Sequence, residues 1–278
     1  YGLRVLLGTS EETGMQDIDY YLARQPQPLF CVTPDADFPV CHGDKGHMNG
    51  VFVSSALNGN LVEFCGGIAD NVVPDRATCL VKADAAQLTP TDRIAIVPKG
   101  DGLARLNAKG IGGHAAFPQG SINAIGLLVD YLLANRLCTA EEEKFLSLLQ
   151  KLHDATDGSG LGIDCSDEVF GPLTIIGGII SLEDGHLRQR IDSRFPTATT
   201  GEEITQKLNA FAQGFAASFE AGHIDPPFLM PEDSPAIQAL LRVYNRVTGK
   251  NAKAFTIGGG TYARHFTQGA AFGAEDPD

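Results

Sequence analysis

The chain has 278 residues, of which 43% are hydrophobic, 8% aromatic and 20% charged, a composition typical of a folded protein with one large or two medium domains. Lys and Arg number 21 and Asp and Glu 34, for a formal net charge of −13. This acidic balance argues against binding to nucleic acid or to an anionic membrane surface. No stretch reaches 18 consecutive apolar residues, so the sequence predicts no membrane-spanning helix.

The first 32 residues have the pattern of a strand, a helix and a second strand. Residues 3–8 and 29–32 are apolar runs, and residues 14–24 have the spacing of a short amphipathic helix that ends before Pro26. A βαβ unit of this length indicates a parallel sheet that is covered on both faces.

The pattern then changes to short strands separated by turn residues, with strands expected at 51–57, 61–65, 77–82, 92–98 and 103–108. Two helices follow, then a hairpin and a third helix, at 122–136, 140–153, 173–182 with 186–192, and 202–219. Towards the C-terminus we expect a helix at 234–247, a strand at 252–257 and a helix that begins near Thr261.

These elements predict an α/β fold with an open, mostly parallel sheet that is interrupted by an inserted α+β domain. The expected boundaries are 1–45 and 227–278 for the two parts of the α/β domain, and 46–226 for the insertion. Because apolar runs lie close to both ends of the chain, we expect an internal part of a longer protein whose α/β domain is incomplete here.

The six cysteines form no C-x-x-C pair, and most lie in apolar runs. We therefore expect buried free thiols and a reducing, cytoplasmic environment.

Two adjacent carboxylates follow the first predicted strand, in Thr9-Ser10-Glu11-Glu12-Thr13-Gly14. Ligands of open parallel sheets bind outside the carboxyl ends of the strands. One carboxylate there could bind a cation while the other acts as a general base. The structural alternative is a capping box formed by Thr9 and Glu12.

A second acidic segment, Pro34-Asp35-Ala36-Asp37-Phe38-Pro39, follows the second predicted strand. The βαβ interpretation places it at the same rim as Glu12, within reach of one metal ion. The alternative is a proline turn with an Asx hydrogen bond. Strand periodicity does not distinguish Asp35 from Asp37, because both point the same way.

Together these two segments resemble the zinc-dependent dipeptidases related to PepV, from the clan that also contains carnosinases, aminoacylases and carboxypeptidase G. Further matching motifs follow in the order of that family over nearly the whole chain. They are Gly66-Gly67-Ile68-Ala69-Asp70-Asn71-Val72-Val73-Pro74, Gly113-His114-Ala115-Ala116-Phe117-Pro118, Asp192-Ser193-Arg194-Phe195-Pro196 and Ile257-Gly258-Gly259-Gly260-Thr261-Tyr262-Ala263-Arg264.

The resemblance implies that Glu11 is the general base for a metal-bound water, that Glu12 bridges to one zinc ion and that Asp35 binds the other. It makes His114 the histidine that hydrogen-bonds the developing oxyanion; an isolated histidine would otherwise be read as a surface residue. Asn71 would supply a further substrate contact, although a turn residue before Pro74 is its structural alternative.

In the same family pattern, Arg194 binds the free carboxylate of the substrate, a task suited to a bidentate guanidinium. The alternative is a solvated polar face of the hairpin. Gly259, Gly260 and Thr261 could cradle a carboxylate with backbone amides at a helix N-terminus, and a tight structural turn is the alternative there.

The sequence departs from the family in its metal ligands. No H-x-D motif precedes the glutamates, and His42-Gly43-Asp44 and His223-Ile224-Asp225 follow them without ending a strand in the expected α/β order. Glu12 and Asp35 alone fall short of the four or five ligands of each zinc. We therefore expect two zinc ions in the parent protein, and no working dinuclear centre in this chain alone.

For the parent protein the resemblance implies hydrolysis of dipeptides, a small peptide as partner, and a catalytic α/β domain with an inserted, ferredoxin-like lid. The insertion between His114 and Arg194 is long, as in the PepV type, which favours a monomer. The alternatives are an N-acyl-amino-acid deacylase of the same clan, or a non-catalytic fragment that serves as an interaction module.

Overall fold

The structure is a computed structural model that describes residues 2–11 and 14–276. The chain divides into two compact units. The inserted unit consists of Gly46–Pro226, and the split unit consists of Tyr1–Lys45 together with Pro227–Asp278.

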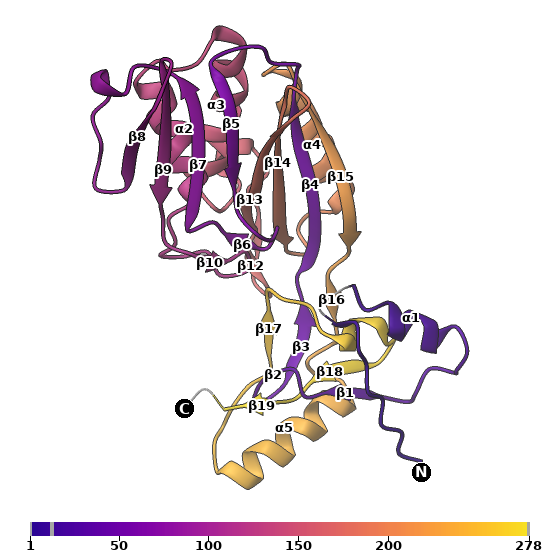
Figure 1. Ribbon diagram of the computed structural model, residues 1–278. Coiled ribbons are helices and arrows are strands. Elements are labelled where there is room, and N and C mark those ends of the chain that lie inside the picture. The colour runs from indigo at the N-terminus through magenta and orange to yellow at the C-terminus, as the bar shows by residue number, and fades with distance from the viewer. Residues whose placement is uncertain (1, 12–13, 277–278) are drawn as a thin grey trace. The chain divides into compact units, whose positions relative to one another are not determined.

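The inserted unit is built on an eight-stranded sheet in the order β15-β4-β14-β13-β5-β7-β9-β8, in which every pairing is antiparallel (Figure 1). Its strands are β4 (Gly46–Ser54), β5 (Leu61–Gly66), β7 (Arg76–Lys82), β8 (Ile94–Gly100), β9 (Leu103–Lys109), β13 (Thr174–Glu183), β14 (His186–Phe195) and β15 (Ala217–Asp225).

Three helices cover one face of this sheet: α2 (Ala124–Ala134), α3 (Ala140–Asp154) and α4 (Gly201–Gln213) (Figure 1). Each begins at a side-chain N-cap, which satisfies an otherwise unpaired backbone N–H; the caps are Asn123, Thr139 and Thr200. The core between sheet and helices is continuous, and its largest fully buried side chains include Phe52, Phe64, Phe145 and Phe195.

Short elements complete the inserted unit. The two-residue strands β6 (Val72–Val73) and β10 (Gly113–His114) pair with each other, as do β11 (Ser166–Asp167) and β12 (Gly171–Pro172). The 3-10 helices η2 (Ala85–Gln87) and η3 (Ser159–Leu161) lie in loops.

The split unit contains a mixed five-stranded sheet. Strands β1 (Cys31–Thr33), β18 (Gly269–Ala271), β3 (Cys41–Asp44) and β16 (Phe228–Leu229) lie in that order, and β17 (Phe255–Ile257) also pairs with β3. The β1–β18 and β17–β3 pairs are parallel, and the other two are antiparallel. A separate parallel pair is formed by β2 (Ala36–Asp37) and β19 (Ala274–Glu275).

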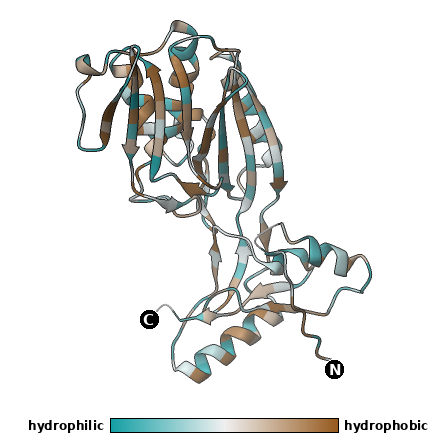
Figure 2. Cartoon of the chain, in the orientation of Figure 1, coloured by the Kyte–Doolittle hydropathy of each residue, from teal (hydrophilic) through white to brown (hydrophobic). Residues whose placement is uncertain are grey.

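The helices of the split unit are α1 (Gln16–Leu22), α5 (Pro235–Thr248) and the 3-10 turn η4 (Tyr262–His265). Helix α5 is amphipathic, with hydrophilic and hydrophobic bands in Figure 2. Its apolar face contributes to a small core that contains Val40, Met230, Ile237, Leu241 and Ala270. The predicted α/β class is confirmed, with the antiparallel, helix-backed sheet in the insertion and the parallel pairs in the split unit.

The strand expected at residues 3–8 is not formed. The segment is extended but unpaired by any described strand, and Leu3 and Leu7 are 93% and 92% exposed; Figure 2 shows it as a hydrophobic stretch near the N-terminus. An apolar run becomes a strand only when neighbouring backbones pair with it. The βαβ expectation was therefore wrong for the described residues, and β1 pairs instead with β18 from the far end of the chain.

Two helix predictions were also too long. The helix expected at 202–219 ends at Gln213, and residues 217–225 form the edge strand β15. The helix expected from Thr261 is the four-residue turn η4. Both H-x-D strings prove to end strands, since β3 ends at Asp44 and β15 ends at Asp225.

No helix in the described part of the chain is both long and apolar enough to cross a membrane.

All six cysteines are free, as expected, but only Cys41 and Cys79 are buried, and Cys65 is exposed. The expectation of buried thiols was thus wrong for Cys65, which follows the buried Phe64 on β5 and points to the opposite face of the strand.

Candidate active site

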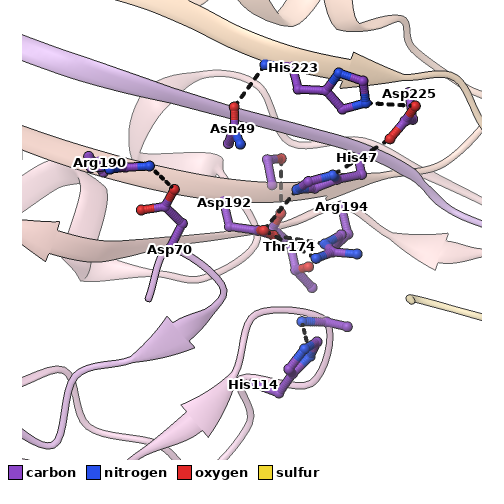
Figure 3. A network of polar contacts seen from close by, with 12 residues as sticks. His47, Asn49, Asp70, His114, Thr174, Arg190, Asp192, Arg194, His223 and Asp225 are labelled. Carbon is purple, nitrogen blue, oxygen red and sulfur yellow. Dashed lines mark hydrogen bonds and ion pairs between the residues drawn. The ribbon is translucent and has the colours of Figure 1, made fainter. Parts of the chain in front are cut away.

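Arg194 belongs to a row of charged side chains across three neighbouring strands of the inserted unit. On β14 it lies opposite His47 of β4, and His47 in turn lies opposite Asp225 of β15. Asp192, two residues before Arg194, faces the same side of the sheet. Figure 3 shows His47, Asp192 and Arg194 pointing toward one another.

Asp192 is the centre of this row. Its Oδ1 accepts a hydrogen bond from Arg194 Nε at 2.8 Å, and its Oδ2 accepts one from Arg194 Nη2 at 3.1 Å. The same Oδ2 lies 2.9 Å from His47 Nε2. Asp192 is 2% exposed and Arg194 is 8% exposed, so solvent screens these charges little.

Burial alone would raise the pKa of Asp192, but the hydrogen bonds from His47 and Arg194 outweigh it and hold this pKa below its usual range. Burial would likewise lower the pKa of His47, yet its hydrogen bond to Asp192 and the nearby carboxylate of Asp225 raise that pKa overall. The row therefore stabilises an ionised Asp192 and favours a protonated His47.

His114 lies on β10, in register with Val72 of β6, and Asn71 directly precedes β6. The backbone N–H of Ala115 donates to the Asn71 carbonyl oxygen at 2.9 Å. The N–H of Ala116 donates to His114 Nδ1 at 3.1 Å, so Nε2 carries the proton of the neutral ring. The exposed His114 ring can thus donate a hydrogen bond from Nε2.

A cavity of about 380 Å³ lies on the same strands of the inserted unit as this charged row. Its lining contains two ion pairs, Arg190 with Asp70 at 2.5 Å and Arg188 with Glu220 at 3.2 Å. Asn49, the register partner of Asp192, also lines it.

In the split unit, the Gly258–Thr261 loop is held by Asp44, which is 2% exposed at the end of β3. Asp44 Oδ2 accepts a hydrogen bond from the Thr261 N–H at 3.0 Å. Burial raises the pKa of Asp44 to about 6, against the opposing effects of the Thr261 hydrogen bond and of Arg264, and the nearby charge of Asp35 adds to the rise. Asp35 itself directly precedes β2.

A Cβ on Gly260 would lie 2.6 Å from Arg264 Nη1, so a larger residue there would displace the end of the Arg264 side chain. Thr261 is buried and caps η4, since its Oγ1 accepts from the Ala263 N–H at 3.2 Å. The helix on which the carboxylate cradle of Gly259, Gly260 and Thr261 was based is only four residues long. A helix dipole therefore gives that prediction no support.

Glu11 is half-buried, whereas Glu12 and Thr13 lie outside the described residues. The neighbouring backbone is held by Asp17, whose Oδ2 accepts hydrogen bonds from the N–H groups of Thr9 and Ser10 at 2.6 and 3.2 Å. The Tyr262 hydroxyl also donates to Asp17, at 3.0 Å. Helix α1 begins at Gln16 without a side-chain cap, so a capping box at Thr9 does not start it.

Within residues 2–11 and 14–276, no group of three or more His, Cys, Asp and Glu side chains could hold a metal ion. Asp35 is the only predicted metal ligand among the described residues, and one carboxylate does not make a zinc site.

Sequence reasoning missed His47, and it named Asp44 and Asp225 only as parts of H-x-D strings that it set aside. His47 and Asp225 meet Arg194 only through the register of strands that are far apart in the sequence. The alternating residue pattern of the two H-x-D strings is typical of a strand end. This pattern could have placed Asp44 and Asp225 at the ends of strands.

Comparison with known proteins shows which class of protein the chain resembles. The fold resembles the crystal structure of an aminoacylhistidine dipeptidase from Vibrio alginolyticus, with a TM-score of 0.50 and 13% identity over 95% of this chain and 63% of that one. In sequence, the chain is 31% identical to a Beta-Ala-Xaa dipeptidase from Lactobacillus delbrueckii subsp. lactis, over 97% of this chain and 60% of that protein.

It is also 29% identical to the "Putative dipeptidase YtjP" of Bacillus subtilis, over 98% of this chain and 61% of that protein. No family model matches the chain. The resemblance to PepV- and carnosinase-like dipeptidases is confirmed, and the chain spans about 60% of the length of the curated relatives it matches.

Proposed function

We propose that the full-length protein hydrolyses dipeptides that carry a free C-terminal carboxylate. The observation that carries this proposal is sequence similarity to a Beta-Ala-Xaa dipeptidase along 97% of the chain, at 31% identity. The six motifs that occur in family order support it further, because each motif alone is a weak signal.

In this proposal, Glu11 takes a proton from the water that attacks the peptide carbonyl carbon, and then delivers a proton to the leaving amine. His114 donates a hydrogen bond from Nε2 to the carbonyl oxygen as negative charge develops on it. The tautomer imposed by the Ala116 N–H supports this assignment, because it leaves the proton on Nε2.

Substrate binding is assigned to the remaining motif residues. Arg194 binds the C-terminal carboxylate, and Asn71 makes a further polar contact. Gly259, Gly260 and Thr261 offer backbone N–H groups, of which the Thr261 N–H already donates to Asp44. The backbone N–H groups of Gly259 and Gly260 are therefore more important to this assignment than the N–H of Thr261.

Two zinc ions are part of the proposal for the full-length protein, where they would polarise the carbonyl and acidify the water. This chain supplies Glu12 and Asp35, which are too few ligands on their own. A cytoplasmic location and a monomeric state are also proposed; the six free cysteines support the first.

The test uses purified full-length protein with a panel of dipeptides and their N-acetylated counterparts, with and without a chelator. We expect hydrolysis of the unblocked dipeptides and its loss with chelator. Hydrolysis of the blocked substrates alone would identify a deacylase, and hydrolysis of neither would favour a non-catalytic module. Chelator-resistant turnover would contradict the metal-dependent part of the proposal.

A further inference from the structure

The guanidinium of Arg194 is not an isolated positive charge. It already forms two hydrogen bonds with Asp192, at 2.8 and 3.1 Å. Such a bidentate pair is neutral as a whole, so a substrate carboxylate approaching Arg194 also meets the negative charge of Asp192. Whether this pair attracts or repels an anion therefore depends on the groups around it.

Those groups come from the two strands on the β4 side of β14. His47 on β4 lies 2.9 Å from Asp192 through Nε2 and 3.9 Å from Asp225 through Nδ1. On β15, His223 Nε2 lies 2.9 Å from the other oxygen of Asp225. Figure 3 shows this continuous chain of contacts from His223 to Arg194.

The protonation of the two histidines decides the charge of this five-residue cluster. With both histidines neutral, one guanidinium and two carboxylates give a net charge of −1. Protonation of His47 brings the cluster to zero, and protonation of His223 as well brings it to +1. Of the two, His47 touches Asp192 directly, so it controls how much of the Asp192 charge faces Arg194.

We propose that His47 is a positioning residue for substrate binding, which holds Asp192 in place and, when protonated, offsets its charge so that Arg194 can attract the substrate carboxylate. This inference rests on the proposed function, in which Arg194 binds that carboxylate. It adds a residue outside every motif of the resemblance, brought to the site by strand register alone.

The electrostatics of the row agree with this role. Burial and the charge of Arg194 would lower the pKa of His47, but its hydrogen bond to Asp192 and the nearby carboxylate of Asp225 raise this pKa overall. A base with a raised pKa is charged below that value and neutral above it. The KM for a dipeptide should therefore rise as the pH increases through the pKa of His47, with much less change in kcat.

The test compares the full-length enzyme with His47→Gln, which keeps a polar side chain but has no charge. At pH 6 we expect an approximately tenfold higher KM in the variant, with kcat within about twofold, because one charge close to the bound carboxylate is missing. At pH 9 the two KM values should converge. His47→Lys, whose charge persists, should keep KM low across this range.

His186→Gln is the matched control, because His186 also lies at the end of a strand in this sheet but outside the charged row, with its Nδ1 2.8 Å from the Ser54 backbone oxygen. It should follow the wild-type pH profile. Should His47→Gln not fold, Asp225→Asn gives a second test, since losing this partner should move the rise in KM to lower pH.

Equal KM values for wild type and His47→Gln at pH 6, or an unmoved profile in Asp225→Asn, would overturn the role of His47. Absence of dipeptide hydrolysis by the wild type would instead overturn the proposed function. The two failures are therefore distinguishable.

Discussion

Glu142 is fully buried in the inserted unit, where its carboxylate joins two segments. Oε2 accepts from the Thr139 N–H at 2.7 Å and completes a capping box, while Oε1 accepts from the Leu61 N–H at 2.8 Å. His153 lies near the end of the same helix, and its Nε2 is a buried atom for which the described residues offer no hydrogen-bond partner. A Cβ on Gly126 would lie 2.9 Å from the His153 Cβ and 3.1 Å from its Cγ, so the glycine allows this side chain to pack closely.

Replacing Glu142 with alanine should lower the free energy of unfolding by about 3 kcal/mol, because two backbone N–H groups lose their acceptors in the interior. Glu143→Ala, one residue along and exposed, should change it by less than about 0.5 kcal/mol. Urea unfolding of the three proteins would measure this. Equal stabilities for the two variants would show that the Glu142 contacts contribute nothing.

His153 should make the protein less stable in acid. Burial lowers its pKa to about 4, so between pH 6.5 and pH 4 the unfolded chain binds a proton that the folded chain does not. Stability should therefore fall on acidification, by about 3 kcal/mol in total from this group. In His153→Gln the slope of unfolding free energy against pH should be shallower over this range. A slope identical to that of wild type would contradict the assignment.

At the scale of secondary structure, local signals predicted most elements of the inserted unit. The strand expected at 61–65 is Leu61–Gly66, and the helix expected at 140–153 is Ala140–Asp154. These succeed because alternation and N-caps are local properties. The strand β3 was missed because its polar residues are buried only by pairing with distant strands. The same holds for the candidate site. Its motif residues could be predicted from the sequence, but the residues next to Arg194 depend on the register between distant strands.

Two glycines allow the turn before Asn71 to pack against β13. Gly67 has a φ of +83°, and a Cβ there would lie 1.8 Å from the Gly178 carbonyl oxygen. A Cβ on Gly178 would in turn lie 2.2 Å from the Asp70 carbonyl oxygen. Close backbone contact thus positions the segment that carries Asn71.

Gly67→Ala should therefore destabilise the protein by about 3 kcal/mol or more, since steric overlap adds to backbone strain. Gly102→Ala is the matched control: its φ is +70°, but nothing lies within 4 Å of the added Cβ, so about 1 kcal/mol is expected. Thermal unfolding of both variants measures the difference. Similar losses would mean that the Gly67 contact relaxes at no cost.

At the scale of the whole molecule, each unit has its own hydrophobic core, and the chain spans about 60% of the length of its curated relatives. The split unit carries the predicted base Glu11 and the predicted ligand Asp35, and the inserted unit carries His114, Asn71 and Arg194. The proposed chemistry requires both sets of residues. Activity should therefore be measured on the full-length protein.

The most direct measurement of the central claim is the rate at which full-length wild type and Glu11→Gln release free amino acids from an unblocked dipeptide. Metal content is determined on the same samples. The wild type should hydrolyse the dipeptide, and Glu11→Gln should lose at least about a hundredfold in kcat, because the general base is gone, while retaining its metal. Comparable turnover by the two proteins, or none by the wild type with its metal bound, would contradict the account.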